Sequence, residues 1–302
     1  MKYLVIGAGG TGGPIGAYLT RAGKDVTLIA RGEHLRKICS EGLKVETSWD
    51  DGFTVYPNAC EMEEYRERPD VVFVCVKGYS LDEATTFLRK IAHPDLIVIP
   101  ILNLYGTGER LQRQLSDVCV LDGCIYVSAN IARPGVIYMH GKIFRVVYGV
   151  RSQEEDRPVL GKIREDLEES GICAIVSENI KRDALQKFSY VSPMASCGLY
   201  YDAVAGDMQK EGKERTLFVD LIREIEKLAQ KMGISFTVDL VENNLKILDD
   251  LAPSASTSMQ RDIAAGKQSE IDGLLFEVVR LGEKYGVPTP AYQMVAEKFG
   301  SR

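Results

Sequence analysis

Histidine is scarce in this 302-residue chain, and its cysteines lack the spacing that metal or redox chemistry requires. The seven cysteines contain no C-x-x-C pair and are odd in number, and some, such as Cys75 and Cys124, lie in apolar segments. We therefore expect buried, reduced thiols of a cytoplasmic protein rather than a disulfide framework. A metal site is not expected, because the three histidines show no ligand spacing: His34, His93 and His140.

Long hydrophobic runs and an excess of positive charge are also missing. The longest apolar runs, such as Val71–Val76 and Leu96–Leu102, have the length of a strand and are far shorter than a membrane span. The chain starts with a strand-like segment, Lys2–Ile6, and lacks the basic and apolar regions of a signal peptide. A formal net charge of −6 disfavours a general binder of nucleic acid or of an anionic membrane, because such binders need a broad basic surface.

The first half of the sequence alternates strand-like and helix-like segments, which predicts a parallel sheet covered by helices on both faces. Expected strands lie at about residues 3–7, 25–30, 71–76, 96–101, 119–128, 136–139, 144–149 and 173–176, and expected helices at about 14–22, 34–41, 80–91, 108–115 and 154–170. We assign residues 1–177 to this α/β domain.

From Glu178 onward the sequence is typical of helices. Apolar residues recur with a period of 3.6 in Leu217–Met232, Leu240–Leu251 and Glu270–Tyr285, and Gly233 and Gly286 are plausible helix ends. We assign residues 178–302 to an all-helical second domain. The helix before Gly233 could pack within this domain or against a second subunit, so a homodimer is one expectation.

A glycine-rich motif follows the first strand. Gly7, Gly9 and Gly12 have the G-x-G-x-x-G spacing that lets a backbone approach a pyrophosphate and lets a helix N-terminus face the phosphates. Because the motif stands between a strand and a helix, it is strong evidence for a dinucleotide site. The predicted cofactor loop is Gly7, Ala8, Gly9, Gly10, Thr11 and Gly12.

Basic residues replace the acidic residue that usually ends the second strand of an NAD-binding unit. Arg31 stands there, and its guanidinium can bind the 2′-phosphate of NADP, which a carboxylate would repel. Lys77 follows Val71–Val76 and should emerge at the same edge of the sheet. The alternative for both residues is a solvated surface cation.

Two charged residues lie on apolar stripes of the second domain. Lys187 shares a helical stripe with Ile180 and Phe188, and an inward ammonium is costly unless it is paired or contacts a ligand. A lysine whose head reaches solvent at a helix edge is the equally weighted alternative. Glu270 starts another stripe, where Ser269 could cap the helix and leave Glu270 as an ordinary first-turn acid.

These residues together resemble the ketopantoate reductase family over nearly the whole chain. The resemblance includes the glycine motif, Arg31, the lysine of VKGYS, the segment LNLYGT, the helix with LQKF, and the pattern SMQRDIAAGKQSEID. It implies a Rossmann-type N-terminal domain, an all-helical C-terminal domain, and NADPH-dependent reduction of 2-dehydropantoate (ketopantoate) to pantoate on the route to coenzyme A.

The resemblance also implies roles for individual residues. Lys187 is similar to the general acid that protonates the ketone oxygen, and Glu270 to a carboxylate that interacts with this lysine, the substrate and the cofactor. Ser258 matches a hydroxyl that binds the substrate carboxylate, and Asn103 an amide that touches cofactor and substrate. Hydride addition builds negative charge on the carbonyl oxygen, which an ammonium can stabilise and protonate.

Some positions depart from the family pattern and keep other functions open. Leu104 stands where the family often has glycine, and Val191, Ala195 and Ala255 stand where it usually has asparagine. The first alternative is the same reaction on another small 2-oxo or 3-oxo acid. The second is an NADPH-binding sensor without turnover, against which the retained Lys187 and Glu270 argue.

Overall fold

The computed structural model describes residues 1–300 and, for Glu154, the backbone alone. The chain forms two compact units. Unit 1 comprises Met1–Leu102 and Gly106–Ile180, and unit 2 comprises Asn103–Tyr105 and Lys181–Arg302. The sequence placed one boundary between residues 177 and 178. The assignment of Asn103–Tyr105 to unit 2 has no signal in composition or periodicity.

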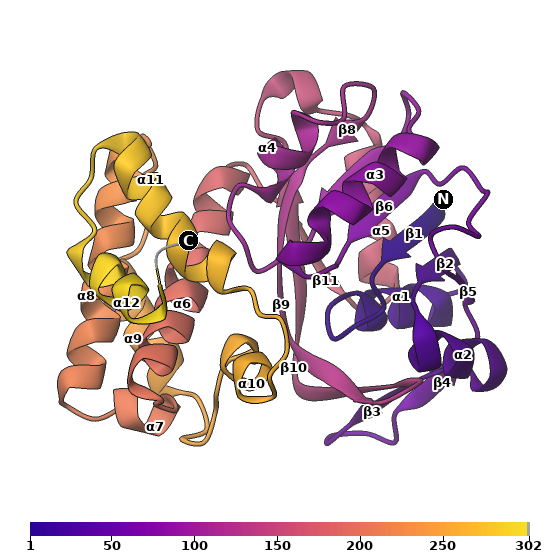
Figure 1. Cartoon of the computed structure of the whole chain (residues 1–302). Coiled ribbons are helices and arrows are strands. Elements are labelled where there is room, and N and C mark those ends of the chain that lie inside the picture. The colour runs from indigo at the N-terminus through magenta and orange to yellow at the C-terminus, as the bar shows by residue number, and fades with distance from the viewer. Residues whose placement is uncertain (301–302) are drawn as a thin grey trace. The chain divides into compact units, whose positions relative to one another are not determined.

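Unit 1 contains a six-stranded parallel sheet with the strand order β5-β2-β1-β6-β7-β8 (Figure 1). In the central strands β1 and β6 nearly every residue is buried, because helices and a second sheet cover both faces. The predicted Rossmann-type fold class is confirmed. The strands are β1 (Lys2–Ile6), β2 (Asp25–Ile29), β5 (Asn58–Cys60), β6 (Val71–Val74), β7 (Ile97–Pro100) and β8 (Cys119–Val120).

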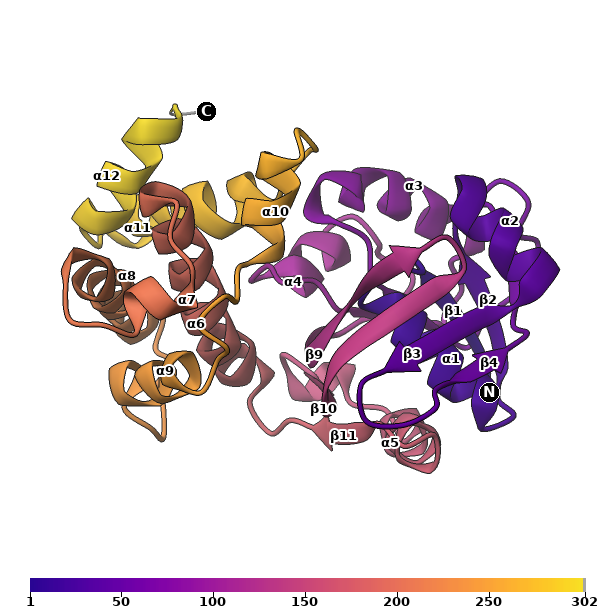
Figure 2. The ribbon, with the colours of Figure 1, turned by 90° about the horizontal axis from the view of Figure 1, so that it is seen from below.

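A second, five-stranded sheet completes unit 1, and the sequence did not separate it from the first. Its order is β11-β10-β3-β4, with β9 paired to β10 (Figure 2). The predicted strands 136–139 and 144–149 are one long strand with a register shift against β9, and the predicted strand 119–128 is divided between the two sheets. The strands are β3 (Leu43–Thr47), β4 (Phe53–Val55), β9 (Asp122–Arg133), β10 (Val136–Gly149) and β11 (Cys173–Val176).

Helix α1 (Gly12–Arg21) packs between the two sheets, because it contacts β1 and β2 of the first and β3 and β4 of the second. Its small residues make this possible. A Cβ on Gly16 would clash with Leu28 of β2, and a Cβ on Gly13 would lie 2.8 Å from Ile137 of β10. Glycines beyond the G-x-G-x-x-G motif therefore serve helix packing.

The other helices of unit 1 lie close to their predicted positions, with one correction. The helix expected at 154–170 begins only at Val159, where Pro158 fixes a backbone suited to a helix start. The helical segments are α2 (Gly32–Glu41), η1 (Gly78–Ser80), α3 (Leu81–Ile91), α4 (Thr107–Gln112), η2 (Gln153–Glu155) and α5 (Val159–Glu169).

Unit 2 is helical and has its own apolar core. The apolar stripe of α8 is buried in this core, so the stripe considered for a subunit contact packs within the unit. Gly233 and Gly286 follow α8 and α11 with φ of +71° and +65°. The helices are α6 (Ile180–Tyr201), α7 (Ala205–Met208), α8 (Lys213–Lys231), α9 (Leu240–Asp249), α10 (Ser258–Ala264), the π-helical turn η3 (Asp272–Phe276), α11 (Glu277–Tyr285) and α12 (Pro290–Phe299).

The interpretation of Ser269 as a helix cap is wrong. The helical segment that leads into α11 opens with the π-helical turn η3, its N-cap position is Ile271, and no side chain caps it. Glu270 is 6% exposed and precedes this turn, so it is not an ordinary solvated acid of a first α-helical turn.

Candidate functional site

The predicted cofactor loop connects β1 to α1 in unit 1. Gly7 adopts φ of +99°, and a Cβ there would lie 3.0 Å from the carbonyl oxygen of Cys75. A Cβ on Gly12 would clash with the carbonyl oxygen of Gly7, and one on Gly10 with that of Ala129 in β9. These three positions require glycine for folding, because protein backbone occupies the space that a side chain would need.

Gly9 differs from its neighbours. A Cβ on Gly9 would meet no protein atom within 4 Å, so the absence of a side chain here leaves open space beside the loop. The backbone of Gly9 still takes part in the fold, since its carbonyl accepts the N–H of Gly13 at 2.7 Å. A glycine that the fold does not require, in a loop before a helix N-terminus, fits the close approach of a pyrophosphate.

The two predicted phosphate-binding cations follow strands of the parallel sheet. Arg31 is exposed at the N-cap position of α2, directly after β2. Lys77 is half-buried at the N-cap position of η1, after β6. Because β1 lies between β2 and β6 in a parallel sheet, both residues emerge at the edge that carries the cofactor loop.

Lys187 and Asn103 meet in unit 2. The Nζ of Lys187 donates a hydrogen bond to Oδ1 of Asn103 at 2.7 Å, although the two residues are 84 positions apart. Their neighbours also meet, since the rings of Tyr105 and Phe188 lie 6.1 Å apart between centroids. The lysine is half-buried, and its hydrogen bond to an amide gives the ammonium a defined position, which is what a proton donor in a reductive site requires.

Ser258 and Glu270 also lie in unit 2. Ser258 is the first residue of α10, where Thr257 caps the helix by accepting the N–H of Gln260. Glu270 is buried two residues before the start of η3, and its carbonyl oxygen accepts the N–H of Leu274 at 3.0 Å. Thus the unit that holds Lys187 also holds the other side chains predicted to contact a substrate.

Sequence reasoning missed two contacts that shape this region. A Cβ on Gly273, within the π-helical turn, would lie 2.5 Å from Leu104, so the bulk of Leu104 and the glycine complement each other. Ser192 donates to the carbonyl oxygen of Leu274 at 2.6 Å and also bonds Tyr292 at 2.6 Å. The only sequence signal for the contact between Leu104 and Gly273 was a leucine at a position where the family often has glycine. The hydrogen bonds of Ser192 had no sequence signal.

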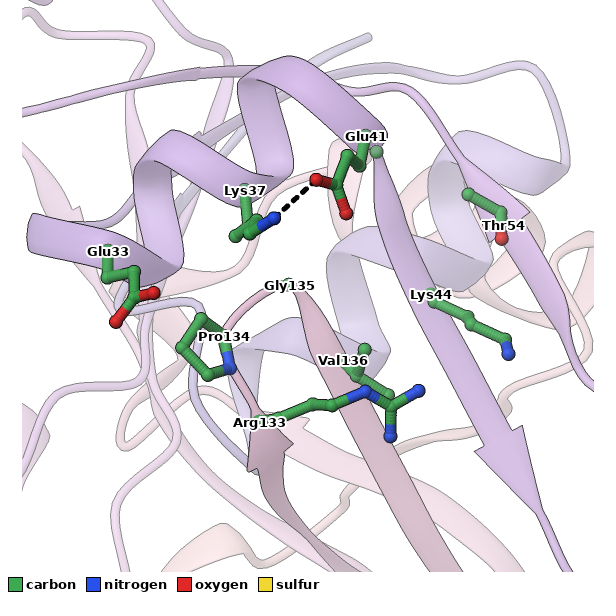
Figure 3. Close-up of a pocket in the computed structure, with 10 residues that line it drawn as sticks. Glu33, Lys37, Glu41, Lys44, Thr54, Arg133, Pro134, Gly135 and Val136 are labelled. Carbon is green, nitrogen blue, oxygen red and sulfur yellow. Dashed lines mark hydrogen bonds and ion pairs between the residues drawn. The ribbon is translucent and has the colours of Figure 1, made fainter.

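A pocket elsewhere in unit 1 has a volume of about 310 Å³ (Figure 3). Most of its charged side chains are in ion pairs. Lys37 bonds Glu41, and Arg133 bonds Glu46 at 2.7 Å, which lowers the pKa of Glu46 to about 2. None of the predicted site residues lines it, and we do not assign it to the chemistry.

Two further properties concern the described residues 1–300. Within them, no group of three histidine, cysteine, aspartate or glutamate side chains is arranged to hold a metal ion. No described helix has the length and apolar character to cross a membrane.

Comparison with known proteins identifies the family. The family described as "Ketopantoate reductase PanE/ApbA" matches residues 3–153, and its C-terminal counterpart matches residues 179–301. The chain belongs to the ketopantoate reductase family. It is therefore an oxidoreductase of a family that uses NADPH.

Relatives match along nearly the full chain. The "Uncharacterized oxidoreductase YkpB" of Bacillus subtilis (strain 168) is 27% identical over 299 residues, which cover 98% of this chain and 96% of that protein. The 2-dehydropantoate 2-reductase of Aquifex aeolicus (strain VF5) is 25% identical over 301 residues, covering 98% and 95%.

Solved structures share the fold. The PanE/ApbA family ketopantoate reductase from Ralstonia eutropha JMP134 has a TM-score of 0.89 and 24% identity, with 99% of this chain and 97% of that one covered. A D-mandelate dehydrogenase, solved with NADH and anilino(oxo)acetate, has a TM-score of 0.88 and 22% identity, with 98% and 96% covered.

The positions at which this ketopantoate reductase family member departs from the family pattern differ in their surroundings. Ala195 is fully buried in the core of unit 2, whereas Val191 and Ala255 are half-buried. Val191 lies one helical turn after Lys187 on the same face of α6. The apolar replacement at 191 therefore lies beside the lysine, and the one at 195 is a packing residue.

Proposed function

We propose that this protein reduces 2-dehydropantoate (ketopantoate) to pantoate with NADPH, in the pathway to pantothenate and coenzyme A. The observation that carries the proposal is the hydrogen bond from Lys187 to Asn103, because it brings together two residues that are distant in sequence and to which the proposal assigns roles. Family membership supports the reaction type.

The described residues of unit 1 fit the cofactor. The open space beside Gly9 admits a pyrophosphate, and the backbone N–H groups at the start of α1 supply hydrogen-bond donors. Arg31, exposed at the end of β2, is assigned to the 2′-phosphate, and Lys77 to a second phosphate contact. When bound, NADPH supplies the hydride.

In the proposed mechanism the residues of unit 2 orient the substrate and move the proton. Lys187 transfers a proton from Nζ to the carbonyl oxygen as negative charge develops there. Asn103 holds Nζ in place through its Oδ1. Ser258 is assigned to the substrate carboxylate, and Glu270 to contacts with the lysine, the substrate and the cofactor.

A second candidate is the same reaction on a 2-oxo acid with an apolar side chain. Half-buried Val191 lies one turn from Lys187, and half-buried Leu104 adjoins Asn103, so apolar surface flanks the lysine–amide pair on both partners. A D-mandelate dehydrogenase with the same fold agrees with a substrate that lacks the hydroxyl of ketopantoate.

We also propose a homodimer, assembled without the apolar stripe of α8, which is already buried. Light scattering during size-exclusion chromatography tests this state directly. A monomer at micromolar concentration would contradict it.

The test of function is steady-state oxidation of NADPH with ketopantoate beside 2-oxo acids that lack its hydroxyl, such as 2-oxoisovalerate and benzoylformate, with NADH as a control. The highest kcat/KM with ketopantoate supports the pantothenate role. A higher value with an apolar acid selects the second candidate. Tight NADPH binding without turnover of any acid contradicts both and favours a sensor.

A further inference from the structure

His34 connects three segments of unit 1. It lies in the first turn of α2 and is half-buried. Its Nε2 is 2.9 Å from the carbonyl oxygen of Ala8, inside the cofactor loop. Its Nδ1 accepts a hydrogen bond from the backbone N–H of Gly135, in the turn between β9 and β10, at 3.0 Å.

These two partners determine the protonation state of the ring. A peptide N–H can only donate, so Nδ1 facing Gly135 must carry a lone pair. A peptide carbonyl can only accept, so Nε2 facing Ala8 must carry the hydrogen. The arrangement therefore requires neutral imidazole with its hydrogen on Nε2.

The hairpin β9–β10 also packs against the cofactor loop and α1 through apolar and backbone contacts. Gly10 allows the loop to reach the carbonyl oxygen of Ala129 in β9, and Gly13 allows α1 to reach Ile137 in β10. His34 adds the polar connection between hairpin and loop. The shape of the loop thus depends on a hairpin distant in sequence and on one ring between them.

We propose that His34 is a positioning residue for nucleotide binding, which in its neutral form holds the cofactor loop, α2 and the β9–β10 turn together. The inference rests on the cofactor assignment of the proposed function and does not depend on the substrate. Protonation places a hydrogen on Nδ1 against the N–H of Gly135, so acid removes the hairpin connection and leaves the one to Ala8.

The charged groups around His34 do not oppose this assignment. On α2 they are Arg31, Glu33 and Lys37, of which Lys37 pairs with Glu41. On the hairpin the neighbour is Arg133, which pairs with Glu46, and the cofactor loop has no titratable side chain. Burial lowers the pKa of His34, while its bond to Ala8 acts in the opposite direction.

The decisive variant is His34→Gln. Its amide N–H can reach the carbonyl of Ala8, but its acceptor Oε1 does not occupy the position of Nδ1 opposite Gly135. The variant therefore keeps the contact to the cofactor loop and lacks the one to the hairpin at every pH. NADPH affinity of both proteins is measured by nucleotide fluorescence, each protein being checked for folding by circular dichroism. At about pH 8 the variant should bind about two- to tenfold more weakly, as expected for one neutral hydrogen bond.

The pH dependence separates this role from a merely structural one. As pH falls below 6.5 and through the lowered pKa of His34, the ratio of the two dissociation constants should approach one, because the wild type acquires the defect of the variant. Titration of the 2′-phosphate affects both proteins alike and cancels in the ratio. A ratio that stays constant with pH, or equals one throughout, overturns the proposal.

Two further variants complete the experiment. His34→Asn offers a non-titrating acceptor near the Nδ1 position, and its affinity relative to His34→Gln should not vary with pH. His93→Gln is the matched control, because Nε2 of His93 also lies 2.8 Å from a carbonyl, that of Pro69, away from the cofactor loop. It should bind like wild type. A wild type that binds neither NADPH nor NADH would contradict the cofactor assignment and this proposal with it.

Discussion

In unit 1 the predicted cofactor loop presents main chain, whereas in unit 2 the groups assigned to chemistry are side chains from separate segments. Gly7, Gly10 and Gly12 are needed because backbone fills the space of their missing side chains. Lys187 depends instead on an amide 84 residues away. A site built from main chain is encoded in consecutive residues, while a site built from side chains is encoded in how the whole unit packs.

This difference between the units predicts that NADPH binding and catalytic turnover can be impaired by separate substitutions. We expect the largest effect on turnover at Lys187. Lys187→Met should lower kcat by about 10²–10⁴-fold, because the proton donor is lost, with little change in NADPH affinity. Stopped-flow turnover and nucleotide fluorescence measure the two quantities. The matched control is Lys181→Met on the exposed side of the same helix. Equal turnover of the two variants would remove the general-acid role.

Arg31→Ala should produce the complementary defect. Loss of a charge-assisted contact to the 2′-phosphate should cost about 1.5–3 kcal/mol of NADPH binding and leave NADH binding unchanged. Arg36→Ala, at another exposed arginine of α2, is the control for net charge. If calorimetry finds the same loss for both nucleotides, the assignment of Arg31 to the 2′-phosphate is wrong.

Substitutions at two glycines of the cofactor loop should have different effects, one on the stability of the fold and the other on NADPH binding. Gly12→Ala should lower the free energy of unfolding by about 1–3 kcal/mol, since its Cβ would overlap the carbonyl of Gly7. Gly9→Ala should leave the melting temperature of the nucleotide-free protein unchanged and still weaken NADPH binding, because its Cβ enters open space. Normal NADPH binding by a stable Gly9→Ala protein would exclude the pyrophosphate from that space.

The smallest effect concerns the stability of the nucleotide-free protein in acid. Since the pKa of His34 lies below its unfolded value of 6.5, neutral His34 stabilises the fold above pH 6.5, and this contribution is lost as pH falls through the folded-state pKa. The stability difference between wild type and His34→Gln, about 0.5–1.5 kcal/mol at neutral pH, should therefore shrink in acid. Thermal melts of wild type and His34→Gln from neutral to acidic pH, with His93→Gln as control, measure whether this stability difference decreases.

The sequence alone predicted those parts of the fold that depend on residues close together in the chain. The alternation of strand-like and helix-like segments predicted the parallel sheet, the glycine motif Gly7–Gly12 predicted its loop, and period-3.6 stripes predicted α8 and α9. The second sheet was missed because β3 and β4 are short, and because β3 pairs with β10, whose residues come almost a hundred positions later. No local pattern records such pairings.

The candidate site shows the same limit. The roles of Asn103, Ser258 and Glu270 came from resemblance. Nothing in the sequence around Asn103 and Ser258 distinguishes them from surface residues, and the apolar stripe at Glu270 indicated a helix face but no chemical role. Ser269 followed a valid capping rule and was wrong, since the π-helical turn starts the helix later than periodicity indicates. His34 had no signal, because both of its partners are backbone atoms.

The inclusion of Asn103–Tyr105 in unit 2 bears on how this protein can be recombined with its relatives. The chain passes from one unit to the other after Leu102, after Tyr105 and after Ile180, so two separate segments of the sequence form the second unit. A chimera that exchanges only residues 181–302 would pair a foreign lysine helix and a foreign π-helical turn with the native Leu104. Exchange of residues 103–105 together with the C-terminal segment replaces Leu104 and Gly273 together, so that positions 104 and 273 come from one protein. We expect such discontinuous chimeras to fold where simple fusions fail.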